Sequence, residues 1–138
     1  MKVLGIDYGT KRIGLAVGDT EIGIAFPREV LLNDEFFFPN IRTLCEQEHI
    51  ALLVIGDPLL PRGGETQETR NAREFAKQCQ KEFPSRSVIL WDERYSSKTA
   101  QQSARAMGHT SKTFRGNLDA AAAALLLQTY FDSHSSSS

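Results

Sequence analysis

The feature that most constrains the fold is a change in the spacing of apolar residues along the chain. Up to residue 27, three short apolar runs are joined by tight turns, at 2–7, 12–19 and 22–27. Such runs predict strands in an antiparallel meander, and the glycines within them indicate bulges or close approach by another element. Beyond residue 27, helical spacing alternates with strand-length apolar runs, which predicts a mixed sheet covered by helices.

The rest of the chain predicts two buried strands among several helices. The runs 51–56 and 87–91 are apolar throughout and of strand length, which favours strands buried on both faces. The loop at 57–65 contains two prolines and two glycines. Helical spacing predicts helices over 37–48, 72–83, 96–107 and 118–131. We therefore expect one α/β domain over residues 1–132, with a five-stranded mixed sheet (the meander, then two parallel strands) and helices on both faces.

The composition allows one domain and excludes several classes of protein. The 138 residues are 41% hydrophobic and 24% charged, as expected for a globular domain with one core. A net charge of −1 excludes binding to nucleic acid by bulk charge, although a local basic face stays open. We expect a cytoplasmic protein without membrane contact, with Cys45 and Cys79 as buried thiols, and a disordered serine-rich tail at 133–138.

Four carboxylates stand at the ends of predicted core elements. Asp7 closes the first strand, Asp92 and Glu93 follow the last buried strand, and Asp119 begins the terminal helix. Ligands gather beyond the carboxyl ends of strands in α/β sheets, and clustered carboxylates repel one another unless a cation such as Mg²⁺ or Mn²⁺ binds. Each acid also has a structural alternative: a turn at Asp7, a surface ion pair at Asp92 and Glu93, or a helix-dipole contact at Asp119.

A segment without acidic residues lies between Glu93 and Asp119 and carries five basic ones. Basic side chains beside a metal site suit a phosphate backbone, which they bind with release of counterions. A solvated helix face is the alternative. The residues that we expect to contact nucleic acid, within this segment and elsewhere, are Lys11, Arg12, Arg62, Arg94, Lys98, Arg105, Lys112 and Arg115.

Three motifs, taken together and in this order, resemble those of the YqgF (RuvX) family. They are Gly5-Ile6-Asp7-Tyr8-Gly9-Thr10, then Trp91-Asp92-Glu93-Arg94-Tyr95-Ser96-Ser97, then Asp119-Ala120-Ala121-Ala122-Ala123. The resemblance covers essentially residues 1–132. It implies a ribonuclease H-like fold related to Holliday-junction resolvases, and a cytoplasmic nuclease proposed to process the 5′ end of precursor 16S ribosomal RNA.

The resemblance also implies roles for the acids. Asp7, Glu93 and Asp119 would be the metal-binding catalytic carboxylates, with Asp92 as a further catalytic candidate. In the implied two-metal mechanism, Asp7 bridges two Mg²⁺ or Mn²⁺ ions and a metal-bound water attacks phosphorus. Asp57 departs from the family, which usually has leucine between this glycine and proline; it is either an additional ligand or a surface turn residue.

The sequence thus predicts a metal-dependent endonuclease, a hydrolase acting on ester bonds, with precursor ribosomal RNA as its substrate. The alternatives are a resolvase of four-way DNA junctions and a catalytically idle module that binds nucleic acid or the ribosome. The expected partner is a nucleic acid, either precursor ribosomal RNA or branched DNA, and ribosome association or a homodimer is compatible with this. A kinase of the actin type is disfavoured, because 138 residues supply no second lobe.

Overall fold

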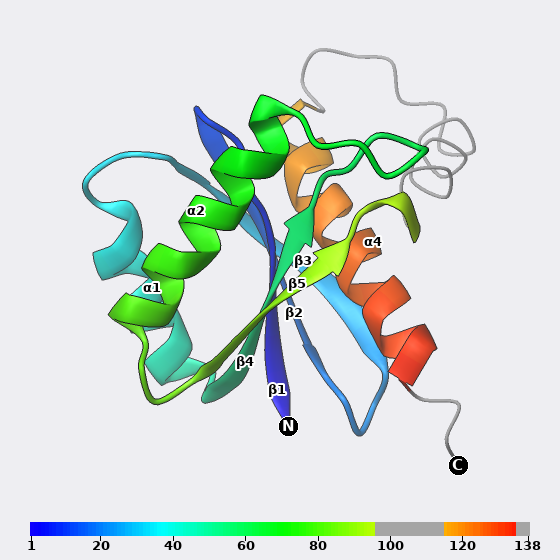
Figure 1. Ribbon diagram of the computed structural model, residues 1–138. Coiled ribbons are helices and arrows are strands. Elements are labelled where there is room, and N and C mark those ends of the chain that lie inside the picture. The colour runs from blue at the N-terminus through cyan, green and yellow to red at the C-terminus, as the bar shows by residue number, and fades with distance from the viewer. Residues whose placement is uncertain (96–114, 135–138) are drawn as a thin grey trace.

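A computed structural model describes residues 1–95 and 115–134 (Figure 1). Its five strands form one sheet, in the spatial order β3-β2-β1-β4-β5. Pairing is antiparallel between β1 and β2 and between β2 and β3, and parallel from β1 to β4 and from β4 to β5. This confirms the predicted mixed sheet. The strands are β1 (Lys2–Asp7), β2 (Arg12–Asp19), β3 (Ile24–Leu32), β4 (Ile50–Asp57) and β5 (Ser87–Asp92).

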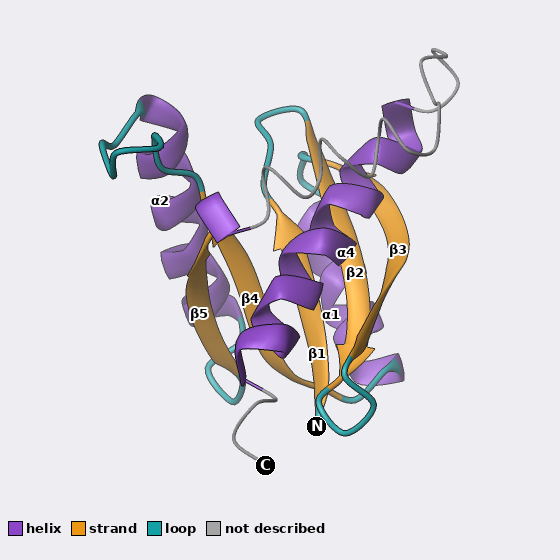
Figure 2. Ribbon diagram, turned by 90° about the vertical axis from the view of Figure 1, so that its right-hand side faces the viewer, coloured by secondary structure: helices purple, strands orange, loops and turns teal. Residues whose placement is uncertain are grey.

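Helices cover both faces of the sheet, as predicted. Helices α1 (Phe37–Gln47) and α2 (Gln67–Glu82) lie on one face, and α4 (Arg115–His134) crosses the other (Figures 1 and 2). Each face has its own buried apolar cluster between sheet and helix. The predicted helix at 96–107 lies outside the described residues. The disordered tail is predicted for 133–138, but residues 133 and 134 form the end of α4, and 135–138 lie outside the described residues.

Helix α4 lies directly on the sheet because two strand glycines leave room for it. A Cβ atom on Gly14 would overlap the carbonyl oxygen of Asp119, and one on Gly5 would lie 2.9 Å from the Cβ of Leu127. These contacts confirm that the glycines permit close approach by another element. They also fix Asp119 beside the middle strands of the sheet.

The third strand differs from its predicted range of 22–27. The turn extends through Gly23, whose φ is 76°, and β3 continues past Pro27 to Leu32. Proline is tolerated here because β3 is an edge strand with a bulge in its pairing to β2.

Helix α2 begins at Gln67, earlier than the predicted 72, because Thr66 caps it. The Thr66 hydroxyl accepts from the backbone N–H of Thr69 at 3.3 Å, and the Thr69 hydroxyl accepts from the N–H of Thr66 at 3.0 Å. The Thr69 hydroxyl also donates to the carbonyl of Pro58. This reciprocal capping box adds one turn to the helix and ties that turn to the end of β4.

Two further findings concern the cysteines and the apolar character of the helices. Cys45 and Cys79 are both buried and free, as predicted. Among the described residues, none of the helices has both the length and the apolar character that crossing a membrane requires.

Candidate active site

Asp7 and Glu93 meet at the carboxyl edge of the parallel strands. Asp7 ends β1, Glu93 directly follows β5, and β4 lies between these two strands. A Cβ atom on Gly56 of β4 would lie 2.7 Å from the Glu93 Cδ, so the glycine leaves the space that the Glu93 side chain occupies. The backbone N–H of Glu93 donates to the carbonyl of Asp57 at 3.2 Å, which fixes where this side chain starts.

The Asp7 and Glu93 carboxyl groups share a hydrogen bond, with Glu93 as the protonated donor. Burial raises the pKa of Asp7, and the negative charge of Asp119 adds to this effect. Burial, followed by the charge of Asp7, raises the pKa of Glu93 to about 8. At neutral pH the pair therefore holds one proton between two carboxylates, a position that a cation can take.

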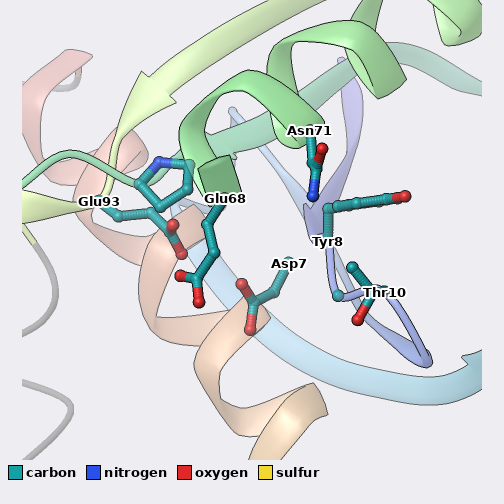
Figure 3. A pocket seen from close by; sticks show the side chains of 8 residues that line it. Asp7, Tyr8, Thr10, Glu68, Asn71 and Glu93 are labelled. Carbon is teal, nitrogen blue, oxygen red and sulfur yellow. The ribbon is translucent and has the colours of Figure 1, made fainter. Parts of the chain in front are cut away.

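A pocket of about 380 Å³ opens beside this pair (Figure 3). Helix α2 contributes Glu68 and Asn71 to its wall, and the Glu68 carboxyl points into the pocket with those of Asp7 and Glu93. The helical spacing predicts neither of these α2 residues as part of a site, because it places the start of that helix at residue 72 and the helix begins at Gln67. The full lining is Asp7, Tyr8, Gly9, Thr10, Pro58, Glu68, Asn71 and Glu93.

Asp119 approaches the pair from α4 without lining the pocket. Its Oδ2 lies 3.3 Å from the Arg12 Nε, which is an ion-pair distance. The geometry between these two atoms is not that of a hydrogen bond, and this buried oxygen accepts none within the described part of the chain. Asp119 thus presents a buried carboxylate oxygen with an unused acceptor, close enough to raise the pKa of Asp7.

Asp92, the fourth predicted catalytic acid, is engaged elsewhere. The Arg94 Nε lies 3.0 Å and 2.9 Å from its two carboxylate oxygens, and the Arg94 backbone N–H donates to Oδ1 at 2.9 Å. These contacts hold the pKa of Asp92 below its usual range. Asp92 does not line the pocket, so the structure does not bring it together with Asp7 and Glu93.

Asp57 is buried at the end of β4, which contradicts the surface-turn alternative. Its two carboxylate oxygens accept from the Arg73 Nε at 3.0 Å and the Arg73 Nη2 at 3.1 Å. Arg73 also forms an ion pair with Glu65 at 3.0 Å. The Asp57 carboxylate is therefore held by α2.

Four of the predicted nucleic-acid contacts are exposed in the structure. Lys11 and Arg12 follow Thr10 of the pocket wall, Arg62 lies in the loop after β4, and Arg94 follows Glu93. The others, Lys98, Arg105 and Lys112, lie outside the described residues, and so does the side chain of Arg115.

The acids fit a divalent cation by donor chemistry. Mg²⁺ and Mn²⁺ prefer carboxylate oxygens, and the site offers a proton-sharing pair at Asp7 and Glu93 beside the unused Asp119 oxygen. In the described part of the chain, however, no three acidic, histidine or cysteine side chains gather closely enough to hold a metal ion. A third ligand from Asp119 requires its carboxylate to turn away from Arg12.

The fold is that of ribonuclease H-like resolvases. The chain is similar to RuvC of Thermus thermophilus, solved with a Holliday junction substrate (TM-score 0.62, 16% identity, 99% of this chain and 97% of that one). It is also similar to the fowlpox virus resolvase, solved with Holliday junction DNA (TM-score 0.56, 11% identity, 96% and 98%). At these identities the likeness establishes the fold.

Sequence comparison establishes the family. The family described as "RuvX: Holliday junction resolvase" matches residues 1–133. Relatives named "Putative pre-16S rRNA nuclease" include one from Corynebacterium jeikeium, 37% identical over 131 residues, which cover 94% of this chain and 84% of the relative. Another, from Nitrosospira multiformis, is 39% identical over 131 residues, covering 94% and 86%. The chain belongs to the RuvX (YqgF) family, as predicted, and it is a nuclease, a hydrolase acting on ester bonds.

Proposed function

We propose that this nuclease is a metal-dependent endonuclease that processes the 5′ end of precursor 16S ribosomal RNA during ribosome biogenesis. The observation that carries the metal-dependent chemistry is the desolvated, proton-sharing pair of Asp7 and Glu93 at the mouth of one pocket. The names of the relatives support the substrate.

The roles of the acids follow from their positions. A divalent cation, Mg²⁺ or Mn²⁺, supplies an activated water and stabilises the leaving oxygen when bound. Asp7 and Glu93 would hold the ion with their carboxylate oxygens, and Glu93 would give up the shared proton as the ion binds. Asp119 would complete the ligand set from α4 once its carboxylate turns away from Arg12. Asp7 ends a strand, Glu93 follows one and Asp119 lies in a helix. Rigid elements rather than a long loop therefore set the orientation of the three carboxylates.

Substrate binding is assigned to the basic residues around the pocket. Lys11, Arg12, Arg62 and Arg94 are exposed and neutralise phosphates on either side of the cleaved bond. We place the activity in the cytoplasm, where precursor ribosomal RNA is processed in bacteria. Association with the ribosome and a homodimer are further parts of the proposal.

The test is cleavage of matched substrates with Mg²⁺ or Mn²⁺: an RNA with a 5′-extended 16S end and a four-way DNA junction. We expect Asp7→Asn to lower RNA cleavage by about 100-fold or more, because it removes one carboxylate charge from the site. Glu29→Gln, which removes an exposed charge on β3, is the matched control and keeps full activity. Cleavage by Asp7→Asn at the wild-type rate would refute the assignment.

The same experiment separates the alternatives. The description of the family favours a DNA junction as the second candidate substrate, and Asp7-dependent cleavage of the junction alone would support it. Binding of both substrates without cleavage would support an idle module. Titration with Mn²⁺ adds a readout that is independent of activity, since only a metal site gives saturable stabilisation that Asp7→Asn abolishes.

A further inference from the structure

An aromatic cluster adjoins the acid pair on the α4 side of the sheet. It consists of Trp91, Tyr95, Tyr130 and His134. The rings of Trp91 and Tyr95 are stacked, with centroids 5.1 Å apart and an interplanar angle of 26°. Trp91 also meets Tyr130 edge-on at 5.5 Å and 88°, and meets His134 at 5.4 Å. Its Nε1 donates to the Thr129 hydroxyl at 3.0 Å, so the Trp91 ring is fixed from several sides.

Tyr95 presents an open aromatic face. One face of its ring lies against Trp91, yet the residue is 63% exposed, so the other face is open to solvent. Tyr130 of the same cluster is only 9% exposed. Within the described residues, Trp91 therefore supports one face of the Tyr95 ring, and most of Tyr95 is exposed. Interaction with a second flat group is the chemistry that such a surface offers.

The open face of Tyr95 stands close to Glu93 along the chain. Trp91 and Tyr95 each stand two residues from Glu93, so their Cα atoms lie within about 7 Å of that of Glu93. Arg94, the neighbour of Tyr95, is exposed and carries a guanidinium group held by Asp92. The backbone position that carries the Tyr95 ring is thus close to that of Glu93, a proposed metal ligand, and next to a cation that suits phosphate.

We propose that the open face of Tyr95, supported by Trp91, stacks one unpaired nucleobase of the substrate next to the phosphate at Asp7 and Glu93. This inference deepens the proposed function and rests on it. Every nucleobase has a flat face, so stacking tolerates any sequence. The base must be free of its partner strand, and the preferred substrate is therefore single-stranded at the cleavage point. The Arg94 guanidinium contacts the backbone of the same nucleotide.

The chain offers a direct probe, because Trp91 is its one tryptophan. The protein is titrated in EDTA, which prevents metal-dependent cleavage, with a short single-stranded RNA and with a blunt duplex of the same sequence. We expect the single strand to quench Trp91 fluorescence and the duplex to leave it unchanged. Tyr95→Ala should weaken binding of the single strand by about tenfold, while Tyr95→Phe keeps the affinity.

Two further variants control for non-specific effects. Tyr95→Leu keeps apolar bulk without a ring and should bind as weakly as Tyr95→Ala. Phe36→Ala removes another exposed aromatic ring, 61% exposed beside α1, and should bind as wild type. Wild-type affinity of Tyr95→Ala or Tyr95→Leu, or equal quenching by duplex and single strand, would overturn the proposal.

Failure of this inference is distinguishable from failure of the proposed function. RNA cleavage that depends on Asp7 but binding that does not depend on Tyr95 would remove the stacking role and keep the metal-dependent nuclease. Binding that depends on Tyr95 without Asp7-dependent cleavage would keep the stacking role and remove the metal-dependent nuclease.

Discussion

Replacing Glu93 by glutamine should stabilise the metal-free protein at neutral pH. Burial and the charge of Asp7 raise the pKa of Glu93 from 4.5 to about 8 on folding. Between these values the folded protein binds a proton that the unfolded chain has released. The contribution of Glu93 to stability is therefore fully present below pH 4.5 and is lost as the pH rises to about 8. Glutamine does not titrate and still offers an N–H donor to Asp7.

The magnitude follows from the width of this window. Each pH unit within it costs about 1.4 kcal/mol, and 4.5 to 7 spans 2.5 units, which sets a ceiling of about 3.5 kcal/mol at pH 7. Glu93 is half-buried, so solvent screening lowers the expected gain to about 1–2 kcal/mol. For a domain of this size, the melting temperature should rise by about 4–8 °C.

The assay is thermal unfolding in EDTA at several pH values between 4.5 and 8. The wild-type melting temperature should fall across this range relative to that of Glu93→Gln, and the exposed control Glu29→Gln should follow wild type. Groups outside the pair titrate equally in all three proteins, so the difference between the curves reports the coupled pair of Asp7 and Glu93. Parallel curves for wild type and Glu93→Gln would refute the reasoning. Added Mg²⁺ should then stabilise wild type more than the variant.

Three further outcomes are expected. Gly14→Ala should destabilise the protein by about 1–3 kcal/mol in denaturant unfolding and slow cleavage, because its methyl group pushes α4 from the sheet. Arg73→Gln should lower stability in denaturant unfolding by leaving the buried Asp57 carboxylate without its bidentate partner, and adding Asp57→Asn should recover part of that loss. A thiol reagent should label Cys45 and Cys79 only on unfolding, because burial raises the pKa of both thiols, that of Cys79 to about 12.

Controls for these outcomes come from the same chain. Arg42→Gln breaks an ion pair with Glu82 in which both side chains are largely exposed, and should change stability by at most about 0.5 kcal/mol. An equal loss from Arg42→Gln and Arg73→Gln would contradict the special role of the Asp57 pair. Rapid labelling of thiols in the folded protein, or unchanged stability of Gly14→Ala, would contradict the packing that the structure describes.

The sequence predicts the sheet and the main acid pair because both depend on regular geometry. Strand-length apolar runs at 51–56 and 87–91 indicate buried parallel strands, and the carboxyl ends of such strands meet at one edge. Glu93 follows the second of these strands, and Asp7 ends β1, which pairs in parallel with β4, so the two acids converge at the same edge of the sheet.

The remaining features depend on local contacts that spacing does not reveal. Whether Asp92 or Glu93 enters the pocket depends on which way each side chain leaves the end of β5, and on the nearby Arg94 that holds Asp92. Glu68 enters the pocket wall because a threonine capping box starts α2 early. The buried Asp57 forms a bidentate ion pair with Arg73 on α2, and no local sequence pattern predicts that pair.

The docking of α4 on a glycine-lined face has a consequence for the order in which the protein matures. Asp7 precedes Asp119 in the chain and is therefore synthesised first, and Asp119 lies in α4. That helix is anchored by contacts such as the one from the Ala25 N–H to the Gln128 Oε1, 103 residues apart. Contacts this distant in sequence form late in folding. A growing chain therefore carries Asp7 and Glu93 before Asp119 is in place, and under the proposed roles it becomes able to cut RNA only after α4 has been made and has docked on the sheet.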